Sequence, residues 1–157
     1  MGRRRKAREI ALQVLYQIDI RQEKLTEEFL DEALYDCKNI SINDEMAEYS
    51  KKLIRGIMEN LTSIDDIIAH FAANWRIDRM AVVDRNILRI AVYELKYRDD
   101  IPSKVAINEA IEIAKRYSTE DSGTFINGIL DGVARSLKEH RTQNTEHRTK
   151  IEIRHHI

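Results

Sequence analysis

Basic residues gather at the start of this sequence in a pattern suited to binding phosphate groups. Arg3, Arg4, Arg5 and Lys6 are consecutive, and Arg8 and Tyr16 follow. A guanidinium group can grip a phosphate with two parallel hydrogen bonds, and a tyrosine ring can stack on an unpaired base. Side chains cannot read the deep major groove of an RNA duplex, so this combination favours a single strand. Residues 3–16 are therefore a candidate RNA-binding segment.

These side chains share one face if residues 4–18 form a helix. At 100° per residue, Arg5, Leu12 and Tyr16 point roughly opposite to the apolar stripe, with Arg8 on the flank. The expected core stripe consists of Ala7, Ile10, Ala11, Val14, Leu15 and Ile18. The alternative to an RNA-binding face is that Leu12 and Tyr16 pack under another helix, while the arginines only keep the surface soluble. Periodicity alone leaves both interpretations open.

A catalytic centre is not recognisable in the sequence. It has no Gly-rich phosphate loop, no G-x-S-x-G elbow and no H-E-x-x-H zinc motif. His70 lies beside the Phe71 and Trp75 cluster without an obvious catalytic partner, so we expect it to be structural. Cys37 is the single cysteine, which excludes an internal disulfide and a zinc cluster built on cysteines. We expect no catalytic residue, no metal and no cofactor.

The composition indicates one globular domain. The 157 residues are 43% hydrophobic and 34% charged, with a formal net charge of −1. The longest stretches without charge, such as residues 67–75, have nine residues. A helix needs about 20 apolar residues to cross a bilayer. We therefore expect a cytoplasmic protein without a membrane segment.

Charge is distributed unevenly along the chain. Residues 1–24 hold seven Lys and Arg against three Asp and Glu, and residues 25–48 hold one against eight. A basic end beside an acidic segment indicates a polyanionic partner for the basic end. Within residues 78–94, acidic and basic side chains are interleaved. Their spacing alone favours a solvated helix face with ion pairs between residues three or four positions apart. A docking surface for a protein partner is the alternative.

The positioning elements are expected to be helical throughout. One proline and five glycines leave little room for the turns of a β protein, and apolar residues recur at helical spacing. We expect about seven helices. Four of them should span residues 4–18, 26–38, 79–98 and 121–138, and three more should begin near residues 44, 63 and 103. Asn43 and Ser63 are candidate N-caps, and Gly128 and Gly132 should allow a close helix contact. The sequence therefore predicts a helical domain over residues 1–138 and a disordered polar tail over residues 139–157.

Four stretches of the sequence resemble one known family. Arg5-Lys6-Ala7-Arg8-Glu9 followed by Leu12-Gln13-Val14-Leu15-Tyr16-Gln17 is similar to the opening of the NusB family of bacterial transcription antitermination factors. Residues 83–95, 102–115 and 125–131 resemble later blocks of the same family, in the same order. Together the blocks cover about residues 3–137.

The resemblance implies an all-α fold of two small helical bundles packed together, and a function without catalysis. NusB proteins bind boxA RNA with NusE, which is also a protein of the small ribosomal subunit, and join the antitermination complex with RNA polymerase, notably on ribosomal RNA operons. The RNA-binding residues that it implies are Arg4, Arg5, Arg8, Tyr16, Arg89 and Phe125. The protein-partner residues that it implies are Asp84 and Asp121.

Two other interpretations belong to different classes. A NusB-like domain also forms the N-terminal part of ribosomal RNA cytosine methyltransferases, in which a Rossmann-like catalytic domain follows. This chain ends soon after its helical domain, so no such catalytic domain is expected here. Some family members resemble homodimers that hide the basic helix, so a homo-oligomeric scaffold without RNA also remains open.

Overall fold

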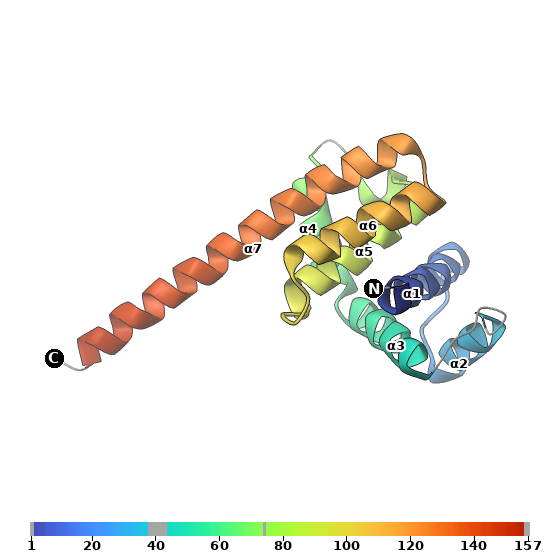
Figure 1. The fold of residues 1–157 in the computed structure, drawn as a ribbon, viewed down its shortest axis with the longest axis horizontal. Helices are drawn as coiled ribbons and strands as arrows, with labels where there is room; N and C mark the ends of the chain where they lie inside the picture. The colour runs from blue at the N-terminus through green and yellow to red at the C-terminus, as the bar shows by residue number, and fades with distance from the viewer. Residues whose placement is uncertain (1, 38–43, 74, 156–157) are drawn as a thin grey trace.

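The computed structural model describes the backbone of residues 2–37, 44–73 and 75–155, with side chains in these ranges apart from Asp44 and residues 144–155. Within this part of the chain the secondary structure is entirely helical, which confirms the expected all-α fold of about seven helices (Figure 1). The elements are α1 (Gly2–Arg21), α2 (Glu27–Asp36), α3 (Asp44–Glu59), α4 (Leu61–Phe71), the short 3-10 helix η2 (Ile77–Arg79), α5 (Val82–Tyr97), α6 (Ser103–Tyr117) and α7 (Glu120–His155).

The helices form two packed groups, as expected. Helices α1–α3 lie on one side of the molecule and α4–α7 on the other (Figure 1). Helix α5 joins the groups, because it packs against α1 and α3 and also against α4, α6 and α7. Helix α1 is enclosed in turn by α3, α5 and α6. Its N-terminal end therefore opens onto a junction of several helices.

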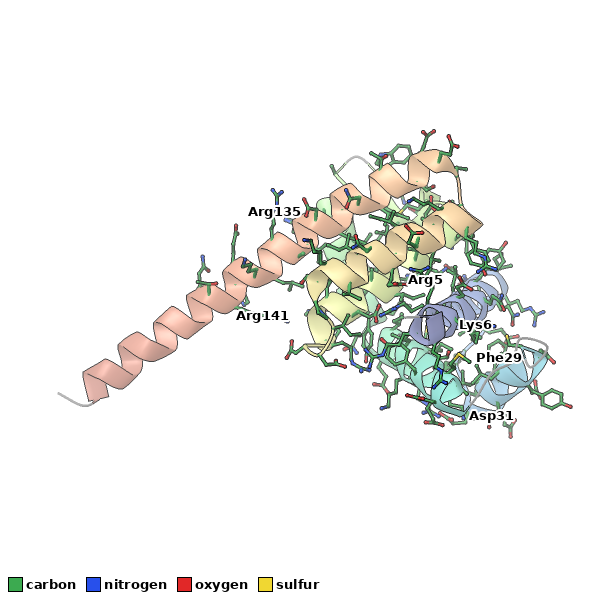
Figure 2. All side chains as sticks on the ribbon, viewed as in Figure 1. Arg5, Lys6, Phe29, Asp31, Arg135 and Arg141 are labelled. Carbon is green, nitrogen blue, oxygen red and sulfur yellow. The ribbon has the colours of Figure 1, made fainter. Side chains whose placement is uncertain are left out.

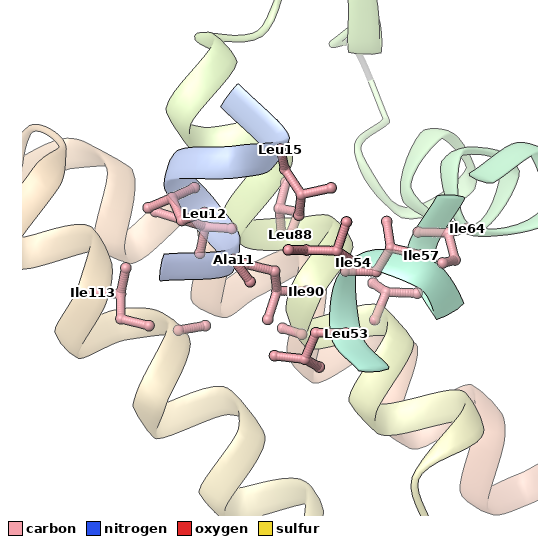
Figure 3. Close-up of a cluster of buried hydrophobic side chains, with 14 of the residues drawn as sticks. Ala11, Leu12, Leu15, Leu53, Ile54, Ile57, Ile64, Leu88, Ile90 and Ile113 are labelled. Carbon is pink, nitrogen blue, oxygen red and sulfur yellow. The ribbon is translucent and has the colours of Figure 1, made fainter. Parts of the chain in front are cut away.

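Apolar side chains from both groups meet in a shared core (Figure 3). Leu15 of α1, Leu53 of α3 and Leu88 of α5 are each at most 2% exposed. Leu12, expected on the face of α1 opposite the core, is also buried at 4% exposed. For Leu12 the packing interpretation is therefore correct. Removal of this apolar surface from water is the main contribution that holds the two groups together.

Two glycines allow close helix contacts. A Cβ added at Gly56 of α3 would lie 2.3 Å from the ring of Tyr93 on α5. A Cβ at Gly132 of α7 would lie 2.8 Å from the ring of Phe71 on α4. The expectation of a close contact is thus confirmed for Gly132. It is wrong for Gly128, which has no such neighbour within 4 Å.

Helix starts agree with the sequence in part. Thr26 caps α2, because its Oγ1 accepts a hydrogen bond of 3.0 Å from the backbone N–H of Phe29. Ser63 does not cap α4, which already begins at Leu61; the hydroxyl of Ser63 accepts instead from Lys96 Nζ at 3.0 Å. The half-buried Leu61 packs on the core, which extends the helix past the expected cap. The candidate cap Asn43 lies outside the described residues.

The backbone of α7 continues as helix to His155, where a disordered tail was expected from residue 139 (Figure 1). Residues 139–155 contain neither glycine nor proline, so each residue can add one hydrogen bond to a helix that is already formed. The apolar spacing that indicates a buried helix face ends near Leu137, so periodicity does not predict a helix beyond this residue. We call residues 136–155 the C-terminal arm.

Candidate nucleic-acid interface

A basic groove runs along the N-terminal end of α1. Its volume is about 770 Å³, and Arg3, Arg4 and Lys6 line one side of it. The side chains of Arg3 and Arg4 are 74% and 52% exposed. Apolar residues form another part of the lining, which we call the apolar wall, namely Met46, Ile101, Pro102 and Val105. Cations beside an apolar wall can hold a phosphate and the base attached to it at the same time.

Arg5 is half-exposed on α1 (Figure 2) and does not itself line this groove, but its partner Glu109 does. Its Nε and Nη2 donate to the two carboxylate oxygens of Glu109 on α6, at 2.7 and 3.0 Å. These hydrogen bonds and the charge of Glu109 raise the pKa of Arg5. Because the fork of the guanidinium already holds a carboxylate, a phosphate would have to share Arg5 with Glu109 or displace it.

Arg8 is buried rather than presented to solvent. It is 2% exposed, and its Nε and Nη2 each donate to a different oxygen of Glu94 on α5 at 2.8 Å. The hydroxyl of Tyr49 on α3 donates to the same carboxylate. Burial lowers the pKa of Arg8, but the hydrogen bonds and charge of Glu94 outweigh this effect and the pKa is raised. Arg8 therefore joins α1 to α5 in a buried ion pair.

Tyr16 remains available on the surface of α1. It is 39% exposed, and it lies three turns beyond Arg4, about 18 Å along the helix. The face proposed from helical periodicity is thus divided in the structure. Arg4, Arg5 and Tyr16 reach solvent, whereas Leu12 and Arg8 pack inside.

Arg89 on α5 is the centre of a second ionic network. It is 9% exposed and binds both oxygens of Asp65 on α4, at 2.8 and 2.9 Å. Its Nη1 also donates to Asp19 of α1 at 3.0 Å, and Asp19 accepts two further hydrogen bonds from Arg85 at 2.6 and 2.7 Å. The charges of α5 thus pair with neighbouring helices, so the expected solvated face with pairs along one helix is wrong.

The electrostatics of Asp19 follow from this network. Burial alone would raise the pKa of its carboxyl group. Hydrogen bonds from Arg85 and Asn86, with the nearby charge of Arg89, outweigh burial, and the pKa lies below its usual value. Asp19 is therefore a carboxylate that fixes the C-terminal half of α1 to α5.

A separate hollow of about 210 Å³ lies where α7 begins. Asp84 of α5 borders it but is 9% exposed, because it accepts hydrogen bonds from Ser118 Oγ at 2.5 Å and Ser122 Oγ at 2.9 Å. Asp121 borders the same hollow and is exposed. Asp84 therefore holds the start of α7, while Asp121 faces solvent.

Aromatic side chains form another wall of this hollow. Phe125 is half-buried and meets the ring of Trp75 edge to face, with centroids 5.8 Å apart. Trp75 is 59% exposed. The sequence did not identify Trp75 as a site residue, whereas Arg79, which also lines the hollow, belongs to the mixed-charge stretch for which a docking surface was the alternative. The sequence does not show whether a tryptophan between two helices is buried or exposed, so it could not mark Trp75 as a candidate site residue.

The fold and this surface define an all-helical protein with a basic groove suited to nucleic acid. None of the helices in the described residues is long and apolar enough to cross a membrane. The described side chains also contain no group of three or more His, Cys, Asp or Glu residues that could hold a metal ion.

Comparison with known proteins identifies the family. Residues 5–135 match the NusB family, and the chain belongs to it. It is 51% identical over 132 residues to the transcription antitermination protein NusB of Listeria monocytogenes serotype 4a, which covers 84% of this chain and 96% of that protein. The NusB of Myxococcus xanthus is 42% identical over 140 residues, which covers 88% of this chain and 99% of that protein.

Solved structures agree with this assignment. The NusB of T. maritima superposes with a TM-score of 0.76 at 45% identity, over 84% of this chain and 90% of that one. A crystal structure of the antitermination factors NusB and NusE in complex with dsRNA gives a TM-score of 0.76 at 33% identity, over 87% and 98%. The resemblance seen in the sequence is therefore confirmed, and the function is transcription antitermination without a catalysed reaction.

Proposed function

We propose that this chain acts in antitermination by binding a boxA-type RNA element together with NusE, and that the basic groove of α1 holds the RNA. The observation that carries the proposal is the position of Arg3, Arg4 and Lys6 along a groove with an apolar wall. A NusB 33% identical to this chain forms a complex with NusE and double-stranded RNA, which supports both partners. The resulting complex would join the transcribing RNA polymerase.

Within this proposal the expected RNA-binding residues have different roles. Arg4 contacts phosphate directly, and Arg5 contacts it after it shares or exchanges Glu109. Tyr16 offers a ring for stacking at the other end of α1. Arg8 and Arg89 are positioning residues, because their guanidinium groups are occupied in buried ion pairs with Glu94 and Asp65.

The hollow beside the start of α7 is the proposed contact with NusE. Asp121 presents a carboxylate there, and Asp84 fixes the helix that carries it. Phe125, expected to contact RNA, lies in this same hollow with Trp75. In this proposal Phe125 therefore belongs to the NusE contact, because it lines the hollow and does not line the α1 groove.

Fluorescence anisotropy on a labelled boxA-like strand tests the proposal. The strand is compared with a scrambled strand and with a boxA-like duplex, with and without NusE, at several salt concentrations. We expect preferential binding to the boxA-like sequence, tightened by NusE. The duplex is included because the RNA of the structural relative is double-stranded, whereas the arginine and tyrosine pattern favours a single strand.

Equal and steeply salt-dependent binding to all three RNAs would contradict the proposal. Such binding would reduce the groove to a non-specific polyanion site, because contacts to phosphate alone carry no sequence information.

A further inference from the structure

The C-terminal arm lies outside the part of the chain that matches the NusB family. The match ends at residue 135, and α7 continues to His155. At 1.5 Å per residue the arm is about 30 Å long. Figure 1 shows the backbone of the arm extending away from the two helical groups.

The arm leaves the body beside the basic groove. Arg141 Nη2 lies 2.9 Å from Asp99 Oδ1 and 3.5 Å from the backbone oxygen of Leu95. The next residue, Asp100, lies 3.9 Å from Arg4 Nη2 and 3.0 Å from Arg98 Nε. The loop between α5 and α6 therefore contacts the arm on one side and the start of α1 on the other.

The same loop also forms part of the groove itself. Ile101 and Pro102, which follow Asp100 directly, belong to its apolar wall. The loop therefore lies between the apolar wall of the groove and the base of the arm. Figure 2 shows Arg135 and Arg141 on α7 at this end of the molecule.

The charge of the arm complements a nucleic acid. Residues 136–157 hold five Lys and Arg against three Glu, a net charge of +2, and the remainder of the chain is therefore at −3. The segment also contains four of the five histidines. A helix of net positive charge that leaves the body beside a basic groove fits a polyanion better than it fits an apolar partner.

We propose that the C-terminal arm is a second RNA-binding surface, which contacts the phosphate backbone of nucleotides flanking the segment held in the α1 groove. The proposal rests on the proposed function, because the groove must hold RNA for the arm to meet the flanking strand. Contacts of this kind add affinity without reading sequence.

The test compares two labelled strands with the full-length chain. The short strand contains only the boxA-like segment, and the long strand adds flanking nucleotides sufficient to run the arm's length of about 30 Å. The variant combines Arg148→Glu, Lys150→Glu and Arg154→Glu. The opposite variant, Glu146→Lys with Glu152→Lys, controls for changes in the helix itself. A third variant with glutamine at the three basic positions removes charge with little effect on helix propensity.

We expect the glutamate variant to bind the long strand on the order of tenfold more weakly and the short strand unchanged. Loss of three phosphate contacts should lower the slope of log affinity against log salt by about 2 for a single strand. The glutamine variant should lose affinity in the same direction, and the lysine variant should bind the long strand more tightly. Circular dichroism checks that helix content is equal.

Unchanged binding of the long strand by the glutamate and glutamine variants would overturn the proposal. Equal loss on both strands would also overturn it, because the arm would then act on the groove and not on flanking RNA. Sedimentation velocity tests a third outcome. If the glutamate variant loses a dimer that the unaltered chain forms, the arm makes a contact between two copies of the chain, which would also overturn the proposal. The proposed function fails separately, if the unaltered chain does not distinguish the short strand from its scrambled control.

Discussion

Arg8 and Glu94 form a bidentate ion pair inside the protein, with both guanidinium to carboxylate distances at 2.8 Å. The pair joins the basic helix α1 to the central helix α5, and the side chains are 3% and 1% exposed. The hydroxyl of Tyr49 donates to the same carboxylate. The basic helix α1 is thus oriented by an arginine that does not itself reach the surface.

Arg8→Ala should therefore act on stability more than on RNA contact. Removing one partner leaves the carboxylate of Glu94 buried without its counter-charge, which typically costs 3–5 kcal/mol. Urea denaturation of the variant measures the loss in the free energy of unfolding. The matched control is Arg55→Ala, which breaks an exposed bidentate pair with Glu27 and should cost much less, because solvent screens an exposed ion pair. Equal costs for the two variants would contradict this assignment.

Arg4→Ala combined with Lys6→Ala should show the opposite behaviour. Both side chains line the groove and neither takes part in a buried ion pair, so stability should change little. Loss of two phosphate contacts should lower the slope of log affinity against log salt by about 1.4 for a single strand. Anisotropy titrations on the boxA-like strand measure this slope.

The control for that variant removes the same charge elsewhere. Arg55→Ala with Lys115→Ala affects exposed pairs on α3 and α6, outside the groove lining. Its salt slope should equal that of the unaltered chain. A slope that falls equally in both double variants would mean that net charge, rather than the groove, governs binding.

The sequence predicted the helices well because their apolar spacing is regular, and this spacing is what burial of one helix face requires. It predicted the burial of the other face poorly. Helical periodicity gives the direction of Leu12 and Arg8 around α1, but it cannot show that α6 and α5 cover that direction. The same reason explains Arg89: the sequence shows an arginine in a mixed-charge stretch, and only the fold brings Asp19 and Asp65 to it.

Asp84 and Asp121 should separate stability from partner binding. Asp84→Asn replaces a carboxylate that accepts from Ser118 and Ser122, and hydrogen bonds to charged groups contribute about 1.5–3 kcal/mol. Thermal unfolding should show a clear decrease in Tm. Asp121→Lys changes an exposed charge in the first turn of α7, so it should lower Tm less than Asp84→Asn does, and it should weaken capture of NusE in a pull-down. Normal capture of NusE by Asp121→Lys would remove this hollow from the partner surface.

Asp19 should make stability depend on pH in the acid range. The pKa of Asp19 is lower in the folded state than in the unfolded state, where it is about 3.9. The contribution of Asp19 to the free energy of unfolding is therefore fully present above the unfolded pKa, and it is lost as pH falls through the folded pKa. Asp19→Asn should cost on the order of 2 kcal/mol near neutral pH. The difference from the unaltered chain should shrink below about pH 4, where the wild-type carboxylate also takes up a proton.

Urea denaturation between neutral pH and pH 3 measures this dependence. Asp66→Asn, at an exposed position of the same type on α4, is the control and should change stability by less than about 0.5 kcal/mol. A difference between Asp19→Asn and the unaltered chain that stays constant down to pH 3 would show that the charge of Asp19 does not stabilise the fold.

Glycine to alanine substitutions should have opposite signs at two helical positions. At Gly56 the added methyl would lie 2.3 Å from the Tyr93 ring, so Gly56→Ala must displace either this ring or the two helices and should cost about 1–3 kcal/mol. At Gly128 nothing lies within 4 Å of the added methyl, so Gly128→Ala should stabilise α7 by up to about 1 kcal/mol. Thermal unfolding should move Tm by roughly 2–4 °C per kcal/mol in a chain of this size. A gain in Tm at Gly56 would mean that the two helices do not approach as closely as this packing requires.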